Sequence, residues 1–158
     1  MKNNYYKFIK RWQIAAPVND VWYSIYESVD WPNWWKGVQR VTVIKENDAN
    51  GINGIRKYVW KSILLYTLSF KMQMVEKTDF KYLKGIAIGE FEGDGEWYFK
   101  EENGITNVQY NWNVKTNKAW MNYFSFLLRP AFKLNHDVVI KWGVQGLANK
   151  LRAKLISA

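Results

Sequence analysis

A single histidine, His136, is the side chain of this sequence whose ordinary pKa lies closest to neutral pH. An imidazole can act as a general base, and burial or a nearby carboxylate would shift its pKa. Asp137 follows directly, but consecutive helix residues point about 100° apart, so the two side chains do not form a dyad by themselves. We expect His136 to orient a ligand or to serve the structure, and catalysis is the alternative. Arg129 and Tyr110 are the other polar candidates for a reaction.

Carboxylates at alternate positions form one acidic cluster: Glu90, Glu92, Asp94 and Glu96. Paired carboxylates can perform acid–base chemistry when their environments separate their pKa values. Gly93 and Gly95 lie between them and favour a bulged, solvent-exposed rim instead, which is our interpretation. A metal site is not expected, because the sequence has one His, no Cys and no pair of acids at ligand spacing. No motif implies a cofactor.

Aromatic side chains are unusually frequent, with ten Trp, ten Tyr and eight Phe. In the predicted strands many apolar residues alternate onto one face, and the last helix adds others. Together they are our candidate ligand-binding residues: Tyr58, Trp60, Tyr66, Leu68, Phe70, Met72, Trp97, Tyr110, Trp112, Phe124, Leu128, Phe132, His136 and Val139. The alternative for about half of the strand aromatics is that they form an ordinary core. Trp31, Trp34 and Trp35 are expected to plug one end of such a cavity or to contact a partner.

The elements that position these residues follow from periodicity. Alternation predicts a strand over 8–16, where Lys10 is the charged exception on the apolar side. Short helices are expected over 18–29 and 31–36, and strands over 38–45, 55–62, 64–74, 81–90, 96–100 and 107–114. Asn103-Gly104 is a strong hairpin turn.

The longest helical pattern lies in residues 119–155 and contains Pro130, which should start or kink a helix. We expect one helix over 130–155, which would span about 39 Å. Gly143 and Gly146 each cost roughly 1 kcal/mol relative to Ala inside it. We expect ordinary helix packing with close approach of the sheet backbone to explain them, and room for a ligand is the alternative.

This order of elements predicts an α+β fold, a curved antiparallel sheet of about seven strands that grips the terminal helix. A closed up-and-down barrel is the second choice. One domain is expected over residues 1–158. A curved sheet covered by one helix need not fill completely, so a cavity is expected between them.

The net charge of +9 is unevenly distributed, since the residues from Lys118 onward contain one acid, Asp137. The lysines are expected to keep the outer helix face soluble, and weak contact with an anionic membrane is the alternative. No nucleic-acid-binding motif is present, so no specific nucleic-acid partner is expected. The absence of Cys, of a signal-peptide core and of a membrane-spanning run predicts a cytoplasmic protein.

An ordered set of short motifs extends over almost the whole chain: Ala16-Pro17 with Val21-Trp22, residues 31–38, Leu83-Lys84-Gly85, Gly89, residues 93–97, Asn135-His136-Asp137, Gly143 and Gly146-Leu147. This set resembles the START-like (SRPBCC, Bet v 1-like) superfamily, and within it the bacterial polyketide cyclase/dehydrase-type proteins. The resemblance implies a helix-grip fold with a cavity for an apolar ligand between sheet and terminal helix. Its members include lipid carriers, hormone receptors and cyclases, so it does not imply one reaction.

No set of residues matches a catalytic motif of the enzymes in that superfamily. We therefore expect the protein to bind a hydrophobic small molecule, namely a lipid, an isoprenoid or an aromatic polyketide-like compound. One alternative is a cyclase- or dehydratase-type enzyme that acts in the same cavity. Another is a membrane- or ribosome-associated regulator that uses the basic terminal helix.

Overall fold

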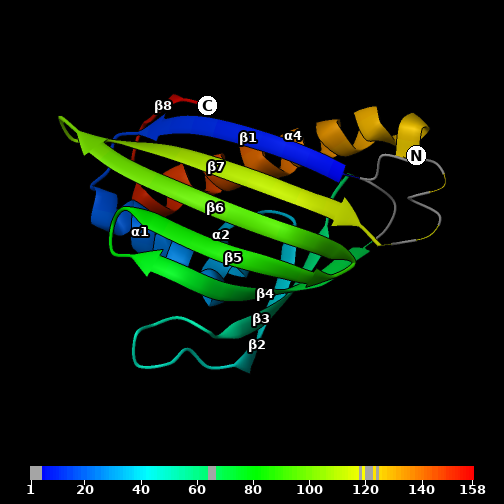
Figure 1. The fold of residues 1–158 in the computed structure, drawn as a ribbon. Helices are drawn as coiled ribbons and strands as arrows, with labels where there is room; N and C mark the ends of the chain where they lie inside the picture. The colour runs from blue at the N-terminus through cyan, green and yellow to red at the C-terminus, as the bar shows by residue number, and fades with distance from the viewer. Residues whose placement is uncertain (1–4, 64–66, 118, 120–122, 124) are drawn as a thin grey trace.

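The computed structural model describes residues 5–63, 67–117, 119, 123 and 125–158, and has an eight-stranded antiparallel sheet with helices on one face (Figure 1). The elements in chain order are β1 (Tyr5–Ile14), α1 (Val18–Tyr26), η1 (Ser28–Asp30), α2 (Trp31–Trp34), β2 (Val38–Lys45), β3 (Ile55–Lys61), β4 (Thr67–Thr78), β5 (Tyr82–Gly89), β6 (Phe91–Glu102), β7 (Ile105–Thr116), α4 (Ser125–Leu151) and β8 (Leu155–Ser157). The predicted α+β helix-grip fold is confirmed.

The sheet is open, with the strand order β2-β3-β4-β5-β6-β7-β1-β8, so the closed barrel was the wrong alternative. Successive strands from β2 to β7 are neighbours, and β1 joins the sheet beside β7. Asn103 and Gly104 both have positive φ and form the tight turn between β6 and β7, as the Asn-Gly pair predicted. The predicted strand over 64–74 is β4, which lies between β3 and β5; its residues 64–66 are outside the described part.

The end of the chain differs from the sequence prediction in two respects. The helix runs from Ser125 to Leu151 with Pro130 inside it, rather than from 130 to 155. Pro130 lies in the second turn on an exposed part of the helix, where loss of one backbone donor is least costly. Arg152 has a φ of 49° and ends the helix, and the Ala153 N–H donates to the carbonyl of Ala148.

The residues beyond that turn form an eighth strand, β8, instead of a last helical turn. Leu155 pairs with Ile14 and Ser157 with Gln13 at the edge of β1. The spacing of Leu151 and Leu155 fits a helix, but Leu155 packs beside β1 because the chain has already reversed. The sheet therefore has one strand more than predicted.

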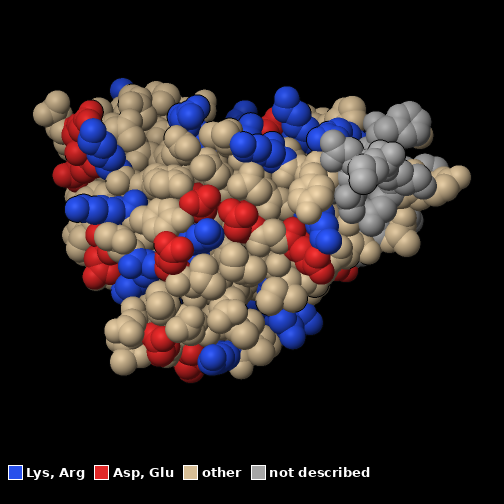
Figure 2. Space-filling view, in the orientation of Figure 1, with Lys and Arg blue, Asp and Glu red and all other residues tan. Residues whose placement is uncertain are grey.

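The outer face of the sheet carries the acidic cluster (Figure 2). β6 is continuous from Phe91 to Glu102, with no register shift against β5 or β7, so the predicted bulge is wrong. Glu96 accepts hydrogen bonds from the hydroxyls of Tyr82 (2.6 Å) and Tyr98 (2.8 Å). These bonds, that of Tyr82 first, hold the pKa of Glu96 below its usual value. The cluster is a solvated outer surface, on the opposite side of the strand from Trp97.

The larger core cluster lies between the sheet and α1, α2 and the second half of α4. Its fully buried members include Ile14, Val21, Trp22, Leu83 and Leu147. A second, smaller cluster surrounds Trp112 and Val114. No described helix combines the length and the apolar composition that crossing a membrane requires.

Candidate functional site

A cavity of about 180 Å³ separates the inner face of the sheet from the helices. The predicted ligand-binding residues that the structure describes all line it: Tyr58, Trp60, Leu68, Phe70, Met72, Trp97, Tyr110, Trp112, Phe132, His136 and Val139. Tyr66, Phe124 and the side chain of Leu128 lie outside the described part of the chain. The strand residues converge because each belongs to the inward set of its strand's period-2 alternation.

Two glycines on paired strands, Gly85 and Gly95, line the floor of the cavity. Gly85 of β5 lies opposite Gly95 of β6, and Ala87 lies opposite Gly93. A Cβ at Gly85 would stand 2.7 Å from Met72 Cε, and one at Gly95 would stand 2.9 Å from Trp112 Cε3. Gly85 and Gly95 therefore mark a close approach, since neighbouring side chains lean over both glycines.

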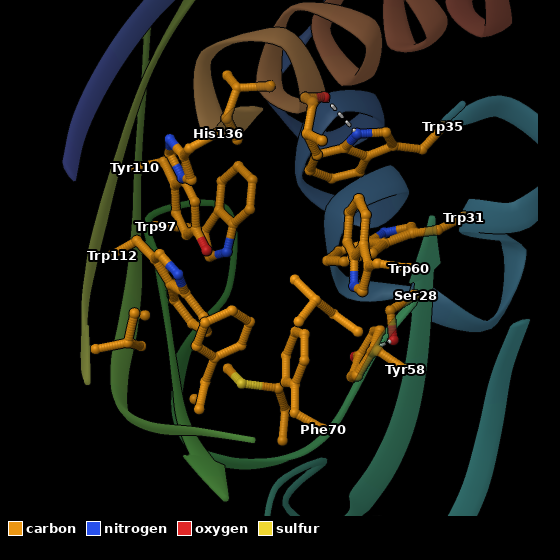
Figure 3. Close-up of a pocket in the computed structure, with 18 of the residues that line it drawn as sticks. Ser28, Trp31, Trp35, Tyr58, Trp60, Phe70, Trp97, Tyr110, Trp112 and His136 are labelled. Atoms are coloured by element: carbon orange, nitrogen blue, oxygen red, sulfur yellow. Dashed lines mark hydrogen bonds between the residues drawn. The ribbon is translucent and has the colours of Figure 1, made fainter. Parts of the chain in front are cut away.

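Aromatic rings form two walls that face each other across the cavity (Figure 3). On one side Trp97 stacks on Tyr110 with centroids 4.1 Å apart, and Trp112 continues the row 6.1 Å from Tyr110. The other wall contains Trp31, Trp35, Trp60 and Tyr58. Phe70 joins the two walls from below, stacked on Tyr58 at 5.8 Å and tilted against Trp112 at 5.9 Å.

The tryptophans expected to plug a cavity end have different roles. Trp31 and Trp35 line the cavity, whereas Trp34 does not. The Trp35 indole N–H donates to the Val139 carbonyl at 2.9 Å, which ties α2 to α4 at the cavity. The Trp31 indole N–H is shared between the carbonyls of Ser24 and Ile25. These bonds fix two rings of the second wall.

Three polar side chains, Ser28, Arg56 and Tyr58, lie together at one side of the cavity. Ser28 and Arg56 were not among the candidate binding residues predicted from the sequence. The hydroxyls of Ser28 and Tyr58 are 2.7 Å apart, and Arg56 Nη1 donates to Ser28 Oγ at 3.2 Å and to the Tyr26 carbonyl at 3.3 Å. No carboxylate among the described residues pairs with Arg56. The signal that was available is its position on β3, two residues before Tyr58 and hence on the same inward face.

His136 lies at the other side, on the first half of α4. Its ring is parallel to that of Phe8 at 4.0 Å and faces that of Tyr110 at 6.3 Å. Burial, with a further contribution from Lys10, lowers the pKa of His136 to about 4, and Asp137 opposes this only in part. Its Nδ1 is buried and has no hydrogen-bond partner among the described residues. The imidazole is neutral at pH 7.

The charged residues beside His136 are engaged with each other. Asp137 pairs with Lys10, the exception noted on the apolar side of β1. Arg129 does not line the cavity; it donates to the Tyr5 carbonyl at 3.0 Å and its guanidinium lies 5.5 Å from the Tyr6 ring centroid. Of the three residues considered for a reaction, the structure brings Tyr110 and His136 together and places Arg129 elsewhere.

The polar atoms that face the cavity are suited to hydrogen bonding rather than to proton abstraction. Burial raises the pKa of the Tyr110 hydroxyl, which points into the cavity as a donor (Figure 3). Asn135 Oδ1 and the Trp60 indole N–H are buried and lack partners in the described structure. A base with a pKa near 4 is far from the value that favours general base catalysis at neutral pH. These polar atoms therefore offer hydrogen-bond donors and an acceptor at the cavity.

The glycines of α4 serve helix packing, as expected, but their neighbour is α2 and not the sheet. A Cβ at Gly143 would overlap the Trp35 indole, and one at Gly146 would overlap the carbonyl of Trp34. Neither glycine lines the cavity, so the alternative that they make room for a ligand is wrong.

Comparison with known proteins supports the architecture. No protein-family model and no curated protein matches the sequence. A solved structure from Thermus thermophilus has a TM-score of 0.78 at 17% identity, covering 92% of this chain and 97% of its own. A Streptomyces aromatase/cyclase has a TM-score of 0.77 at 9% identity, with 94% of each chain covered. The chain has the START-like fold.

A START superfamily protein from Mycobacterium smegmatis agrees with that assignment, with a TM-score of 0.75 at 10% identity and coverage of 92% of this chain and 97% of its own. At such identities the likeness is one of fold. This chain shares with these proteins the sheet that grips a long C-terminal helix.

Proposed function

We propose that this START-like protein binds a flat, largely apolar small molecule that carries oxygen atoms, in the cavity between the sheet and α4. The observation that carries the proposal is the pair of facing aromatic walls, with Tyr110 and Trp112 on one side and Trp31, Trp60 and Tyr58 on the other (Figure 3). Trp35 and Trp97 meet edge to face with ring centroids 6.4 Å apart, so no ring fits between those two. A planar ring system placed between them would bury apolar area against rings on both faces.

The size of the cavity supports ring compounds over long chains. At about 180 Å³ it slightly exceeds the roughly 150 Å³ apolar cavity that accepts benzene in an engineered protein. One or two fused rings match this volume, whereas a long fatty acid or isoprenoid chain exceeds it. Among the three ligand classes expected from the sequence, an aromatic polyketide-like compound is therefore the best supported.

Polar groups at both sides of the cavity supply orientation. Tyr110 and the neutral His136 offer hydrogen bonds to a hydroxyl or carbonyl group. Arg56, beside Ser28 and Tyr58, offers a cation to a carboxylate or phenolate. The aromatase/cyclase among the compared structures points to the same ligand class, but the low pKa of His136 favours binding over acid–base catalysis here.

Tryptophan fluorescence titration with naphthalene, naphthol and naphthoate tests the proposal. These probes share one ring system and differ in their polar group. We expect quenching with dissociation constants in the micromolar range, because several indoles line the cavity. Val139→Phe should fill the cavity and weaken binding by about tenfold or more. Val138→Phe is the matched control, since its side chain does not line the cavity, and it should bind like wild type.

The polar side of the cavity has its own test. Arg56→Gln should lower the affinity for naphthoate by roughly tenfold, because about one charge-assisted hydrogen bond is lost. The affinity for naphthalene should stay unchanged. Loss of a single aromatic wall contact in Trp112→Ala should weaken all three probes by one to two decades. Absence of binding by every probe, or equal binding by the two valine variants, would refute the proposal.

A further inference from the structure

Arg56 is the only charged side chain among the described residues that line the cavity. These lining residues include no Asp or Glu, and His136, whose pKa is lowered to about 4, is neutral at pH 7. A guanidinium stays protonated throughout the physiological pH range. The described lining of the cavity therefore carries a net charge of about +1.

The neighbours of Arg56 fix its position but do not neutralise its charge. Its Nη1 donates to the Tyr26 carbonyl at 3.3 Å and to Ser28 Oγ at 3.2 Å, both neutral acceptors. The Ser28 hydroxyl is itself held 2.7 Å from the hydroxyl of Tyr58. Nε and Nη2 of Arg56 donate to no described residue, so these donors remain for another acceptor. Because Arg56 is partly buried, water screens its charge less than that of an exposed arginine, and an anion beside it is favoured.

The opposite side of the cavity offers neutral hydrogen-bonding groups instead of a charge. Figure 3 shows Tyr110 and His136 across the cavity from Tyr58. The Tyr110 hydroxyl points into the cavity and bonds to no described residue. A neutral imidazole has one acceptor nitrogen, and a phenol hydroxyl is a donor. A hydroxyl group of a ligand suits this side, because it can accept one hydrogen bond and donate another.

We propose that the ligand is a monoanionic aromatic acid that binds in one orientation, with its carboxylate at Arg56 and a phenolic hydroxyl at Tyr110. This inference rests on the binding function proposed above, and it specifies the charge and the direction of the bound molecule. One cation without a counter-ion favours one negative charge, and a planar carboxylate matches the guanidinium. A phosphate monoester carries about 1.5 to 2 negative charges at pH 7, so part of its charge would be buried without a partner.

Calorimetric titration with naphthoate, naphthamide and naphthyl phosphate, substituted at the same ring position, tests the charge of the ligand. We expect wild type to bind naphthoate about tenfold or more tightly than either naphthamide, its neutral isostere, or naphthyl phosphate. In Arg56→Gln the preference for naphthoate over naphthamide should fall to about twofold or less, and Arg56→Lys should restore part of it. Lys57→Gln is the matched control, since Lys57 is exposed on the other face of β3, and should keep the wild-type preference.

The orientation is tested with a hydroxynaphthoate whose two groups lie at opposite ends of the ring system. Wild type should bind it about threefold or more tightly than naphthoate, because one further hydrogen bond forms. Tyr110→Phe should remove this gain and keep the preference for naphthoate over naphthamide. The two polar groups lie on opposite sides of the cavity, so the effects of Arg56→Gln and Tyr110→Phe on the affinity for hydroxynaphthoate should multiply in the double variant.

Equal affinity of wild type for naphthoate and naphthamide would overturn the assignment of an anion, while the binding of both would still support the cavity as the site. Tighter binding of naphthyl phosphate would overturn it in favour of a dianion. A hydroxyl gain that persists in Tyr110→Phe would overturn the orientation. The comparison of the three probes in wild type decides the charge even if Arg56→Gln does not fold. If no probe binds to wild type, the binding function and this inference both fail.

Discussion

Beneath the second half of α4 the interior is filled, whereas beneath residues 132–139 it is hollow. Glycine contributes to both outcomes. Gly143 and Gly146 let the tryptophans of α2 meet the helix directly, so the space is closed by aromatic packing. Gly85 and Gly95 pair on the sheet, where neighbouring side chains lean over both glycines and the space above stays open. A missing side chain closes a gap when a neighbouring element can move in, and leaves one when the neighbours are held apart.

The largest expected effect belongs to the filled end. Gly146→Leu should destabilise the fold by about 3 kcal/mol, because the new side chain meets the Trp34 backbone, which cannot rotate aside. Gln145→Leu is the matched control at the preceding residue, which is exposed, and should change stability by no more than about 0.5 kcal/mol. Urea unfolding measures both. Equal stability of the two variants would mean that α2 can withdraw and that this end is not tightly packed.

The hollow end should show its largest effect in the pH dependence of stability. The pKa of His136 is lowered from 6.5 to about 4 in the folded protein, so the unfolded chain binds a proton more readily between these values. The contribution of His136 to the free energy of unfolding is fully present above pH 6.5. It falls by up to about 3 kcal/mol as the pH decreases to 4. Carboxylates whose pKa values are lowered, such as that of Glu96, begin to lose their contribution only below about pH 5, so they overlap the lower end of this window alone.

His136→Asn removes the titrating group and should flatten the stability profile between pH 6.5 and 5, where His136 is the only histidine. Unfolding followed at several pH values measures the slope directly. A variant with the slope of wild type would show that His136 is solvated and that the cavity admits water to the ring. Such a result would mean that the hollow end holds water in contact with His136 instead of a dry, apolar space.

How much of this contrast the sequence could predict depends on how local the cause is. Alternation within single strands placed Tyr58, Trp60, Phe70 and Trp112 on one face, because side-chain direction in a strand repeats every two residues. Gly143 signalled close approach without naming the partner, since Trp35 lies more than a hundred residues away in the chain. The cavity floor depends likewise on the register that sets β5 against β6.

Two further differences have the same origin in long-range pairing. Lys10 lies on the apolar side of β1 because it pairs with Asp137 of α4, a partner far away in the sequence. The end of α4 was missed because Arg152, which takes a positive φ there, is not a residue type that marks such a turn. The apolar spacing that continued to Leu155 was then satisfied by a strand edge instead of a helix face.

A matched pair of truncations compares the packing of the two halves of α4. Val144→Ala should cost about 2 kcal/mol, since Val144 is buried in the larger core cluster and its removal leaves a new void. Val139→Ala should cost less than about 1 kcal/mol, because that side chain already borders an open space. Thermal unfolding of both proteins measures the difference. Equal losses would indicate that the hollow end closes up in solution.

The smallest expected effect concerns the ion pair that links the filled end to η1. Lys150 donates to the Asp30 carboxylate, with the two side chains 32% and 40% exposed. The hydrogen bond from Lys150 is the first cause, and that from Asn33 the second, of a pKa of Asp30 below its usual value. Because both partners reach solvent, Lys150→Ala should cost only about 0.5 kcal/mol.

That loss should be present at neutral pH, shrink as the pH falls and Asp30 becomes protonated, and shrink also in high salt, which screens exposed pairs. Lys141→Ala is the matched control, an exposed lysine of the same helix that makes no ion pair with any described residue, and it should leave stability unchanged. A loss that exceeds about 2 kcal/mol and ignores salt would show that Lys150 acts mainly through its packing on Trp34, whose ring centroid lies 5.8 Å from the ammonium. The attachment of α4 at the filled end would then depend on the contact of Lys150 with Trp34, with the ion pair to Asp30 contributing nothing.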